Sequence, residues 1–177
     1  MSSTLFLRAD DLERRVCLAV NRTVRWAGMR RLFATVSRLG DGVVWYVLMV
    51  AMPVARGRPG LIATGEMAAA GAFGLLLYKL LKTRLVRERP YVLHAGIDCV
   101  VAPLDRYSFP SGHTLHAVLF TTIAVAWVPM LGLILIPLAV LIALSRVILG
   151  LHYPSDVLVG ALIGGALGRL ANLIAGV

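Results

Sequence analysis

The feature that most limits what this chain can fold into is a long stretch without a single charged residue. From Tyr107 to Ser145 the sequence contains no Asp, Glu, Lys or Arg. A membrane-spanning helix needs only about 20 mostly apolar residues, so this stretch is long enough for more than one span. Charged residues make up 15% of the whole chain, compared with about a quarter in soluble domains. We therefore predict an all-α protein, a multi-pass bundle of transmembrane helices.

The basic residues gather in two clusters. Eight of the 18 Lys and Arg residues lie in residues 1–41, and five more lie between Lys79 and Arg89. Over residues 10–38 the arginines alternate with apolar residues at helical spacing, which is typical of amphipathic helices at an anionic membrane surface. The net charge of +9 is therefore not the mark of a nucleic-acid-binding surface. We divide the chain into an N-terminal interfacial segment, residues 1–41, and a transmembrane domain, residues 42–177.

Gly and Pro residues divide the second part into five predicted spans. The spans cover residues 42–56, 61–81, 113–129, 131–149 and 155–175. Counting the crossings places the end of the second span, the start of the third, the end of the fourth and the start of the fifth on one side. The polar clusters that include Lys82, His113 and Arg146 are therefore expected to meet at one membrane face.

The first cluster is KLLKTRLVRERP, residues 79–90. Lys82 and Arg89 are seven residues apart, so they share a face of a continuous helix. Pro90 then ends the helix or sets its exit angle. A basic helix end that reaches the lipid headgroups would have the same composition, so this cluster alone indicates little.

The second cluster opens FPSGHTLHAVLF, residues 109–120. Ser111 suits a helix cap, and Gly112 lets a ligand approach the backbone. The free N–H groups of the first helical turn form an anion site that the helix dipole strengthens, and His113 stands beside it. Taken singly, Ser111 could be a plain cap and His113 an interfacial polar residue. His116, one turn further on, is interpreted as structural.

The third cluster is SRVILGLHYPSD, residues 145–156. Arg146 ends an otherwise uncharged span, where it needs a partner or an anion. Pro154 can start the last helix, which places His152 before it and Asp156 in its first turn. A carboxylate there can hydrogen-bond one imidazole nitrogen and leave the other free and nucleophilic. The alternative is a His–Asp pair that only steadies a loop.

Taken together, the motifs K-x6-RP, PSGH and SR-x5-H-x3-D resemble the three-part signature of the type 2 phosphatidic acid phosphatase (PAP2) superfamily. Here they are Lys82 to Arg89 and Pro90, Pro110 to His113, and Ser145 and Arg146 to His152 and Asp156. The resemblance covers about residues 79 to 160 and implies a helical core like that of PAP2 enzymes and haloperoxidases. Members of this family often have six spans, whereas this sequence has five and an interfacial helix.

The resemblance implies a phosphohistidine mechanism. His152 would attack phosphorus with Asp156 orienting it, and His113 would protonate the leaving oxygen and then activate water. The groups expected to hold the phosphate oxygens are Lys82, Arg89, Ser111, Gly112 and Arg146. Phosphoryl transfer depends mostly on positioning and charge neutralisation. No metal or other cofactor is expected, because Asp98 and Asp105 look like lone loop acids and no carboxylate cluster for Mg²⁺ is evident.

The expected substrate is an amphiphile whose phosphate lies at headgroup depth while its tail stays in the bilayer. By family analogy, a polyprenyl diphosphate such as undecaprenyl diphosphate comes first, and phosphatidic acid or phosphatidylglycerol phosphate comes next. The loop at residues 91–108 is expected to shape selectivity. We expect the cell (inner) membrane as the location, with the lipid phosphate and membrane lipids as partners and no nucleic acid. The sequence leaves the oligomeric state open, and a homo-oligomer is compatible with it.

Three alternatives remain at this stage. The N-terminal arginines favour a cytoplasmic site by the positive-inside tendency, which would favour a phosphorylated prenyl-sugar or phospholipid intermediate of the inner leaflet. A vanadate-dependent haloperoxidase would have a similar anion pocket, although the apolar spans argue against it. A non-catalytic lipid-binding or transport protein would release no phosphate.

Overall fold

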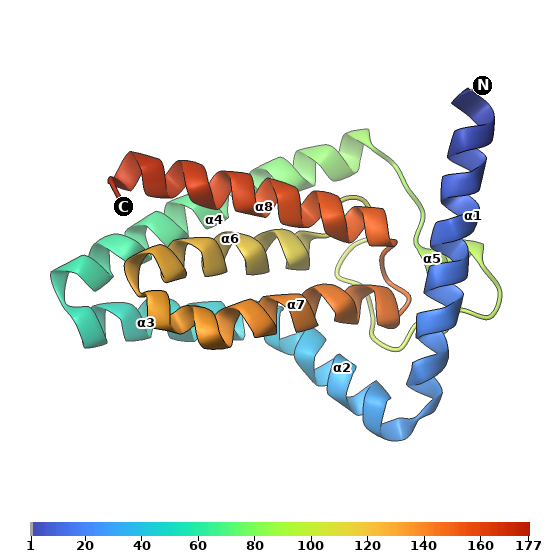
Figure 1. The fold of residues 1–177 in the computed structure, drawn as a ribbon, viewed down its shortest axis with the longest axis horizontal. Helices are drawn as coiled ribbons and strands as arrows, with labels where there is room; N and C mark the ends of the chain where they lie inside the picture. Colours follow the sequence, from blue (N-terminus) through green and yellow to red (C-terminus); the bar gives the residue numbers. More distant parts are fainter. Residues whose placement is uncertain (1) are drawn as a thin grey trace.

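The computed structural model describes residues 2–177, with side chains from Asp10 onward. Its elements are α1 (Ser2–Asn21), η1 (Arg22–Arg25), α2 (Ala27–Leu39), α3 (Val43–Arg56), α4 (Arg58–Arg84), α5 (Pro90–Leu93), α6 (Gly112–Trp127), η2 (Pro129–Leu131), α7 (Gly132–Ile148) and α8 (Pro154–Ala175). There is no strand in residues 2–177, so the all-α prediction is confirmed. Helices α3, α4, α6, α7 and α8 run along the long axis of the molecule, while α1 crosses one end (Figure 1).

The five predicted spans correspond to five helices, but these differ in length. Three segments are long and apolar enough to cross a membrane: Arg58–Arg84, Pro129–Ile148 and Pro154–Ala175. Helices α2 and α3, bent by 49° at the turn between them, would together form a fourth. Helix α6 has 16 residues, about 24 Å, which is shorter than a typical hydrocarbon core of about 30 Å. By length and composition the structure therefore has three or four spans, against the five predicted.

Helix α6 is the centre of the bundle. Its side chains Leu115, Leu119 and Ile123 are fully buried. Glycines of α8 allow the backbones of the two helices to approach closely, because a Cβ atom at Gly164 would lie 2.2 Å from the carbonyl oxygen of Leu115. Small residues at such a spacing are typical of helix contacts in membranes. This packing aligns the first turns of α6 and α8, where two of the three polar clusters lie.

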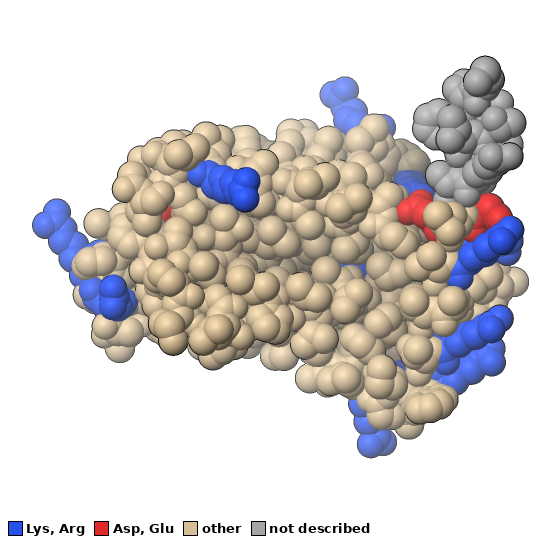
Figure 2. Space-filling view, viewed as in Figure 1, with Lys and Arg blue, Asp and Glu red and all other residues tan. Residues whose placement is uncertain are grey.

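The outer faces of the bundle are apolar. Side chains such as Val54, Leu133 and Leu173 are 72% to 84% exposed on α3, α7 and α8. Figure 2 shows that the side of the bundle is mostly free of charge, whereas Lys and Arg gather at the two ends. An exposed apolar surface of this extent is stable in contact with lipid. The arrangement fits an integral membrane protein.

The N-terminal helices pack against the end of the bundle that carries the polar clusters. Cys17 of α1 is fully buried, and Asn21 is 2% exposed. The Asn21 amide donates to the carbonyl oxygens of Asp98 and Ile148, each at 3.0 Å. The sequence predicts an interfacial amphipathic segment here. In the structure, these helices also cover the loops between α4 and α6 and between α7 and α8.

Candidate active site

A cavity of about 430 Å³ opens at this end of the bundle. It is lined by predicted site residues from all three motifs, namely Lys82, Arg89, Gly112, His113, Arg146 and His152. Asp41, Tyr78 and Asp105 also line it. The structure therefore brings three clusters that are far apart in sequence to one place. Ser111 and Asp156 lie just outside the lining, and both are fully buried.

Arg89 and His152 are in direct contact at the base of the cavity. The Nη1 atom of Arg89 lies 3.2 Å from Nε2 of His152, and it donates to the carbonyl oxygen of Leu151 at 2.7 Å. Both side chains are almost completely buried. Arg89 directly precedes α5, and His152 lies in the short segment between α7 and α8.

The surroundings of His152 favour the neutral imidazole. Burial lowers the pKa of His152 well below its usual value, and the nearby positive charges of Arg146 and Arg89 lower the pKa further. A neutral ring keeps a lone pair on one nitrogen, which a nucleophile requires.

Asp156 does not hydrogen-bond His152 as the sequence suggested. Its Oδ2 atom lies 3.6 Å from Nδ1 of His152, which is beyond a hydrogen bond. Nδ1 has no hydrogen-bond partner among the residues whose side chains the structure describes. The carboxylate instead accepts the backbone N–H of Tyr153 at 2.8 Å and a guanidinium N–H of Arg87 at 2.8 Å. Asp156 thus caps α8 and fixes the segment that carries His152.

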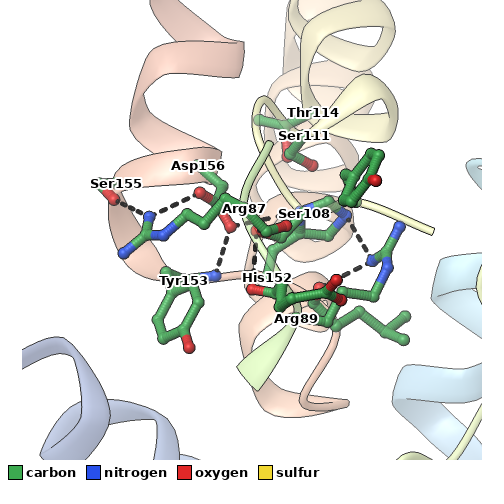
Figure 3. A network of polar contacts seen from close by, with 12 residues as sticks. Arg87, Arg89, Ser108, Ser111, Thr114, His152, Tyr153, Ser155 and Asp156 are labelled. Atoms are coloured by element: carbon green, nitrogen blue, oxygen red, sulfur yellow. Dashed lines mark hydrogen bonds and ion pairs between the residues drawn. The ribbon is translucent and has the colours of Figure 1, made fainter. Parts of the chain in front are cut away.

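Arg87 is a site component that the sequence interpretation missed. The Nη1 atom of Arg87 donates to Asp156 and to the Ser155 hydroxyl, as Figure 3 shows. Its Nη2 atom donates to Glu13 of α1 at 2.6 Å. The guanidinium also lies over the Tyr153 ring at 3.9 Å. The sequence signal for this role is its place two residues before Arg89, in the basic cluster of residues 79–90.

Asp105 is not the isolated loop acid that the sequence suggested. It forms ion pairs with Lys82 and, at 2.7 Å, with Arg89, and it accepts the Tyr78 hydroxyl at 3.0 Å. Burial raises the pKa of Asp105, but the pairs with Lys82 and Arg89 outweigh burial and lower it overall. The loop therefore places a carboxylate between two of the predicted phosphate-binding cations.

The residues at the start of α6 lie in different surroundings. The Ser111 hydroxyl lies 3.0 Å from the Thr114 hydroxyl, Figure 3 shows the two side by side, and Ser111 is not among the residues that line the cavity. Gly112 lines the cavity against the Tyr78 ring. His113 extends into the cavity, where Nε2 lies 2.5 Å from Oδ1 of Asp41. His116 lies 2.9 Å from the carbonyl oxygen of Gly112, within its own helix.

Arg146 is buried, and none of the described side chains gives it a negative partner. Its side chain is about 3% exposed and lines the cavity, and one Nη1 N–H donates to the Ser37 hydroxyl. It forms no ion pair with any residue whose side chain the structure describes, and its Nε has no partner there. A buried guanidinium is costly unless it is paired, so this position calls for an anion.

No group of three His, Cys, Asp or Glu side chains that could hold a metal ion occurs in the described part of the chain. The positive charges that converge on the cavity are those of Lys82, Arg89 and Arg146, together with the first turn of α6. These groups can bind an oxyanion through N–H donors and charge.

Comparisons with known proteins agree with this arrangement. The sequence profile of the PAP2 superfamily matches residues 62–176. A decaprenylphosphoryl-5-phosphoribose phosphatase of Mycobacterium tuberculosis is 32% identical over 157 residues, which are 84% of this chain and 82% of that protein.

Two solved structures have the same fold. The crystal structure of LpxE from Aquifex aeolicus aligns with a TM-score of 0.76 at 28% identity, covering 91% of this chain and 92% of that one. A transmembrane PAP2-type phosphatidylglycerolphosphate phosphatase from Bacillus subtilis aligns with a TM-score of 0.78 at 26% identity, covering 96% and 87%. The chain belongs to the PAP2 superfamily.

Proposed function

We propose that this membrane lipid phosphatase hydrolyses a phosphate ester or diphosphate on a prenyl lipid through a phosphohistidine at His152. The observation that carries the proposal is Arg146, a buried cation that has no carboxylate partner among the described side chains and that shares one cavity with His152. A bound phosphate would supply the missing negative charge.

In the first step, the Nε2 lone pair of His152 attacks phosphorus, and the bond from phosphorus to the leaving oxygen breaks. The protonated His113 ring gives a proton to that oxygen, so the leaving group departs as the lipid alcohol or as a lipid phosphate that carries one more proton. In the second step, His113 takes a proton from water, the resulting hydroxide attacks phosphorus, and the P–N bond breaks. Inorganic phosphate and the neutral His152 ring are regenerated.

Binding of phosphate requires a rearrangement around Arg89. In the structure its N–H groups are engaged with His152, Leu151 and the carboxylate and carbonyl of Asp105. We expect the contacts with His152 and Asp105 to be exchanged for phosphate oxygens. Lys82, Arg146 and the Gly112 N–H would hold the remaining oxygens. Ser111 lies behind the first turn of α6 and would support that turn, whose N–H groups face the phosphate.

The shape of the cavity supports an amphiphilic substrate. From the cationic end it continues between α3, α4 and α6 along apolar side chains that include Trp45, Met49, Met67, Leu75 and Phe120. A phosphate at the polar end would therefore leave a hydrocarbon tail beside apolar residues, where burial is favourable.

The preferred substrates are prenyl-linked. Undecaprenyl diphosphate and a phosphorylated prenyl-sugar both offer a phosphate on a long apolar chain. The similarity to the mycobacterial decaprenylphosphoryl-5-phosphoribose phosphatase, over most of both chains, favours the prenyl-sugar. Phosphatidylglycerol phosphate, named for the Bacillus subtilis relative, and phosphatidic acid follow.

A substrate panel in detergent tests the proposal. Undecaprenyl diphosphate, a decaprenyl phosphosugar phosphate, phosphatidylglycerol phosphate and phosphatidic acid are supplied to the purified chain in excess EDTA, and released phosphate is measured. We expect release from at least one prenyl substrate, inhibition by vanadate, and loss of release in His152→Ala. If His152→Ala releases phosphate at the unmodified rate, or if release strictly needs Mg²⁺, the mechanism is wrong. If no lipid in the panel is hydrolysed, the proposed phosphatase activity is wrong and a non-catalytic role takes its place.

A further inference from the structure

A carboxylate from outside the matched family region contacts the predicted acid–base histidine. Oδ1 of Asp41 lies 2.5 Å from Nε2 of His113. Asp41 lies in the turn between α2 and α3, whereas the PAP2 profile begins at residue 62. The contact therefore joins the N-terminal part of this chain to the catalytic motif.

The turn that carries Asp41 is shaped to bring it there. Gly42 adopts φ +129°, a conformation that residues with a side chain rarely adopt. A Cβ atom at Gly40 would lie 3.0 Å from Ile142 and 3.4 Å from the His113 ring. Glycines on both sides thus allow the turn to pass close to α6 and α7 and to direct Asp41 at His113.

The contact leaves one nitrogen of His113 available. Nε2 is engaged by Asp41, while Nδ1 makes no hydrogen bond with any residue that the structure describes. The ring is 11% exposed and lines the cavity beside Arg146 and His152. A carboxylate on one imidazole nitrogen fixes the tautomer, so that the proton to be exchanged is carried by the other nitrogen.

The two histidines of the site differ in this respect. The carboxylate near His152 is 3.6 Å away and is bound by Arg87, whereas the carboxylate of Asp41 is in hydrogen-bond contact with His113. An acid–base group must carry a positive charge in one step and be neutral in the next, and an adjacent carboxylate stabilises the charged form. A nucleophile must stay neutral until it attacks. Burial and the charge of Arg146 lower the pKa of His113 to about 4, and the hydrogen bond with Asp41 acts against this lowering.

We propose that Asp41 is a positioning residue for proton transfer, which holds His113 through Nε2 so that Nδ1 delivers the proton to the leaving oxygen. The inference rests on the proposed function, because it assigns Asp41 a part in that reaction. In the first step the Nδ1–H proton of His113 moves to the oxygen released from phosphorus. In the second step Nδ1 accepts a proton from the attacking water, while Asp41 keeps its hydrogen bond throughout.

The test varies the leaving group. An alkyl alkoxide needs a proton as it leaves, whereas a nitrophenolate leaves without one. The full chain in detergent is assayed with dodecyl phosphate and with a nitrophenyl phosphate that carries a dodecyl chain. The measured quantity is kcat/KM, which reports the steps up to the departure of the leaving group.

We expect Asp41→Asn to lower kcat/KM about 100-fold or more with dodecyl phosphate and less than about threefold with the nitrophenyl substrate, since general acid catalysis contributes this much only where the leaving group needs a proton. Asp41→Glu keeps the carboxylate and should recover part of the loss. Asp11→Asn makes the same charge change on α1, where Asp11 pairs with Arg14 and Arg15 outside the cavity, and it should alter the hydrolysis of neither substrate.

Equal losses with both substrates would show that Asp41 only supports the fold, and no loss with either would show that His113 does not need it. Either result overturns the inference while His152→Ala still abolishes release in the same preparation. If the unmodified chain hydrolyses neither substrate, or if His152→Ala hydrolyses both, the proposed function itself fails and the inference fails with it.

Discussion

At the scale of single residues, Arg146 lowers the folding stability of the chain, while its charge serves the binding of phosphate. Its guanidinium is buried with a hydroxyl as its only side-chain partner among the described residues. Replacement of a buried charged group by an apolar one of similar volume often stabilises a protein, whereas catalysis needs the charge.

We therefore predict that Arg146→Met raises the free energy of unfolding by about 1 to 4 kcal/mol while phosphate release is lost. Thermal unfolding in detergent, with and without vanadate, measures the effect. Vanadate should stabilise the unmodified chain and not the variant, because only the former binds it. An Arg146→Met chain that is less stable and still binds vanadate would contradict this role.

Spacing in the sequence was sufficient to predict that Lys82, His113 and Arg146 lie at one cavity, because the motifs are near helix ends that the crossings place on one face, but it missed Asp41 and Asp105. The spacing did not predict which of the site residues contact one another. Asp105 of the loop before α6 meets Lys82 of α4, and Arg87 of the loop between α4 and α5 meets Asp156 in the first turn of α8. Such contacts depend on how loops pack in space, and nothing in the local periodicity encodes them. The missing bond between His152 and Asp156 has the same cause, since Arg87 and the backbone of Tyr153 compete for the carboxylate.

At the scale of elements, the packing of α6 against α8 sets the geometry of the site. The backbone N–H of Ser111 donates to the carbonyl oxygen of Asp156 at 3.0 Å, which ties the first turns of the two helices together. Any change that separates these helices must also separate His113 from His152.

We predict that Gly164→Ala lowers both stability and activity, because its Cβ atom would lie 2.2 Å from the Leu115 carbonyl oxygen. Gly165→Ala is the matched control on the same helix, since its Cβ atom would lie 3.7 Å from its nearest neighbour. Melting temperature and phosphate release of the two variants are compared. Similar values for both would mean that the contact between α6 and α8 is not tight.

The positions of the spans in the sequence were predicted well, but their lengths were not. Helix α6 is short because Ser111 and Gly112 begin it at the site and Val128 ends it before η2. A short helix can remain in the bundle because its neighbours cover it, and coverage by neighbours cannot be read from hydropathy alone.

At the scale of the whole molecule, charge suggests an orientation in the membrane. Lys and Arg gather most densely at the end of the bundle crossed by α1 and α2, which is also the site end (Figures 1 and 2). By the positive-inside tendency, this distribution favours a site on the cytoplasmic side of the membrane.

The two native cysteines offer a test of this orientation. Cys99 lies in the exposed loop at the site end, whereas Cys17 is fully buried. We predict that an impermeant maleimide labels Cys99 in inverted membrane vesicles and not in intact cells, and that Cys99→Ser abolishes labelling. Labelling in intact cells would place the site at the outer face and favour substrates of the outer leaflet.

The convergence of three motifs on one nucleophile is the central claim, and the covalent intermediate tests it most directly. The chain is mixed with its best lipid substrate, quenched in base within milliseconds, and digested for mass spectrometry, since a phosphorus–nitrogen bond survives base and is lost in acid. We predict one phosphate on His152 during turnover and none in His152→Ala. Phosphate on another residue, or turnover with no phosphorylated residue at any time point, would contradict the account.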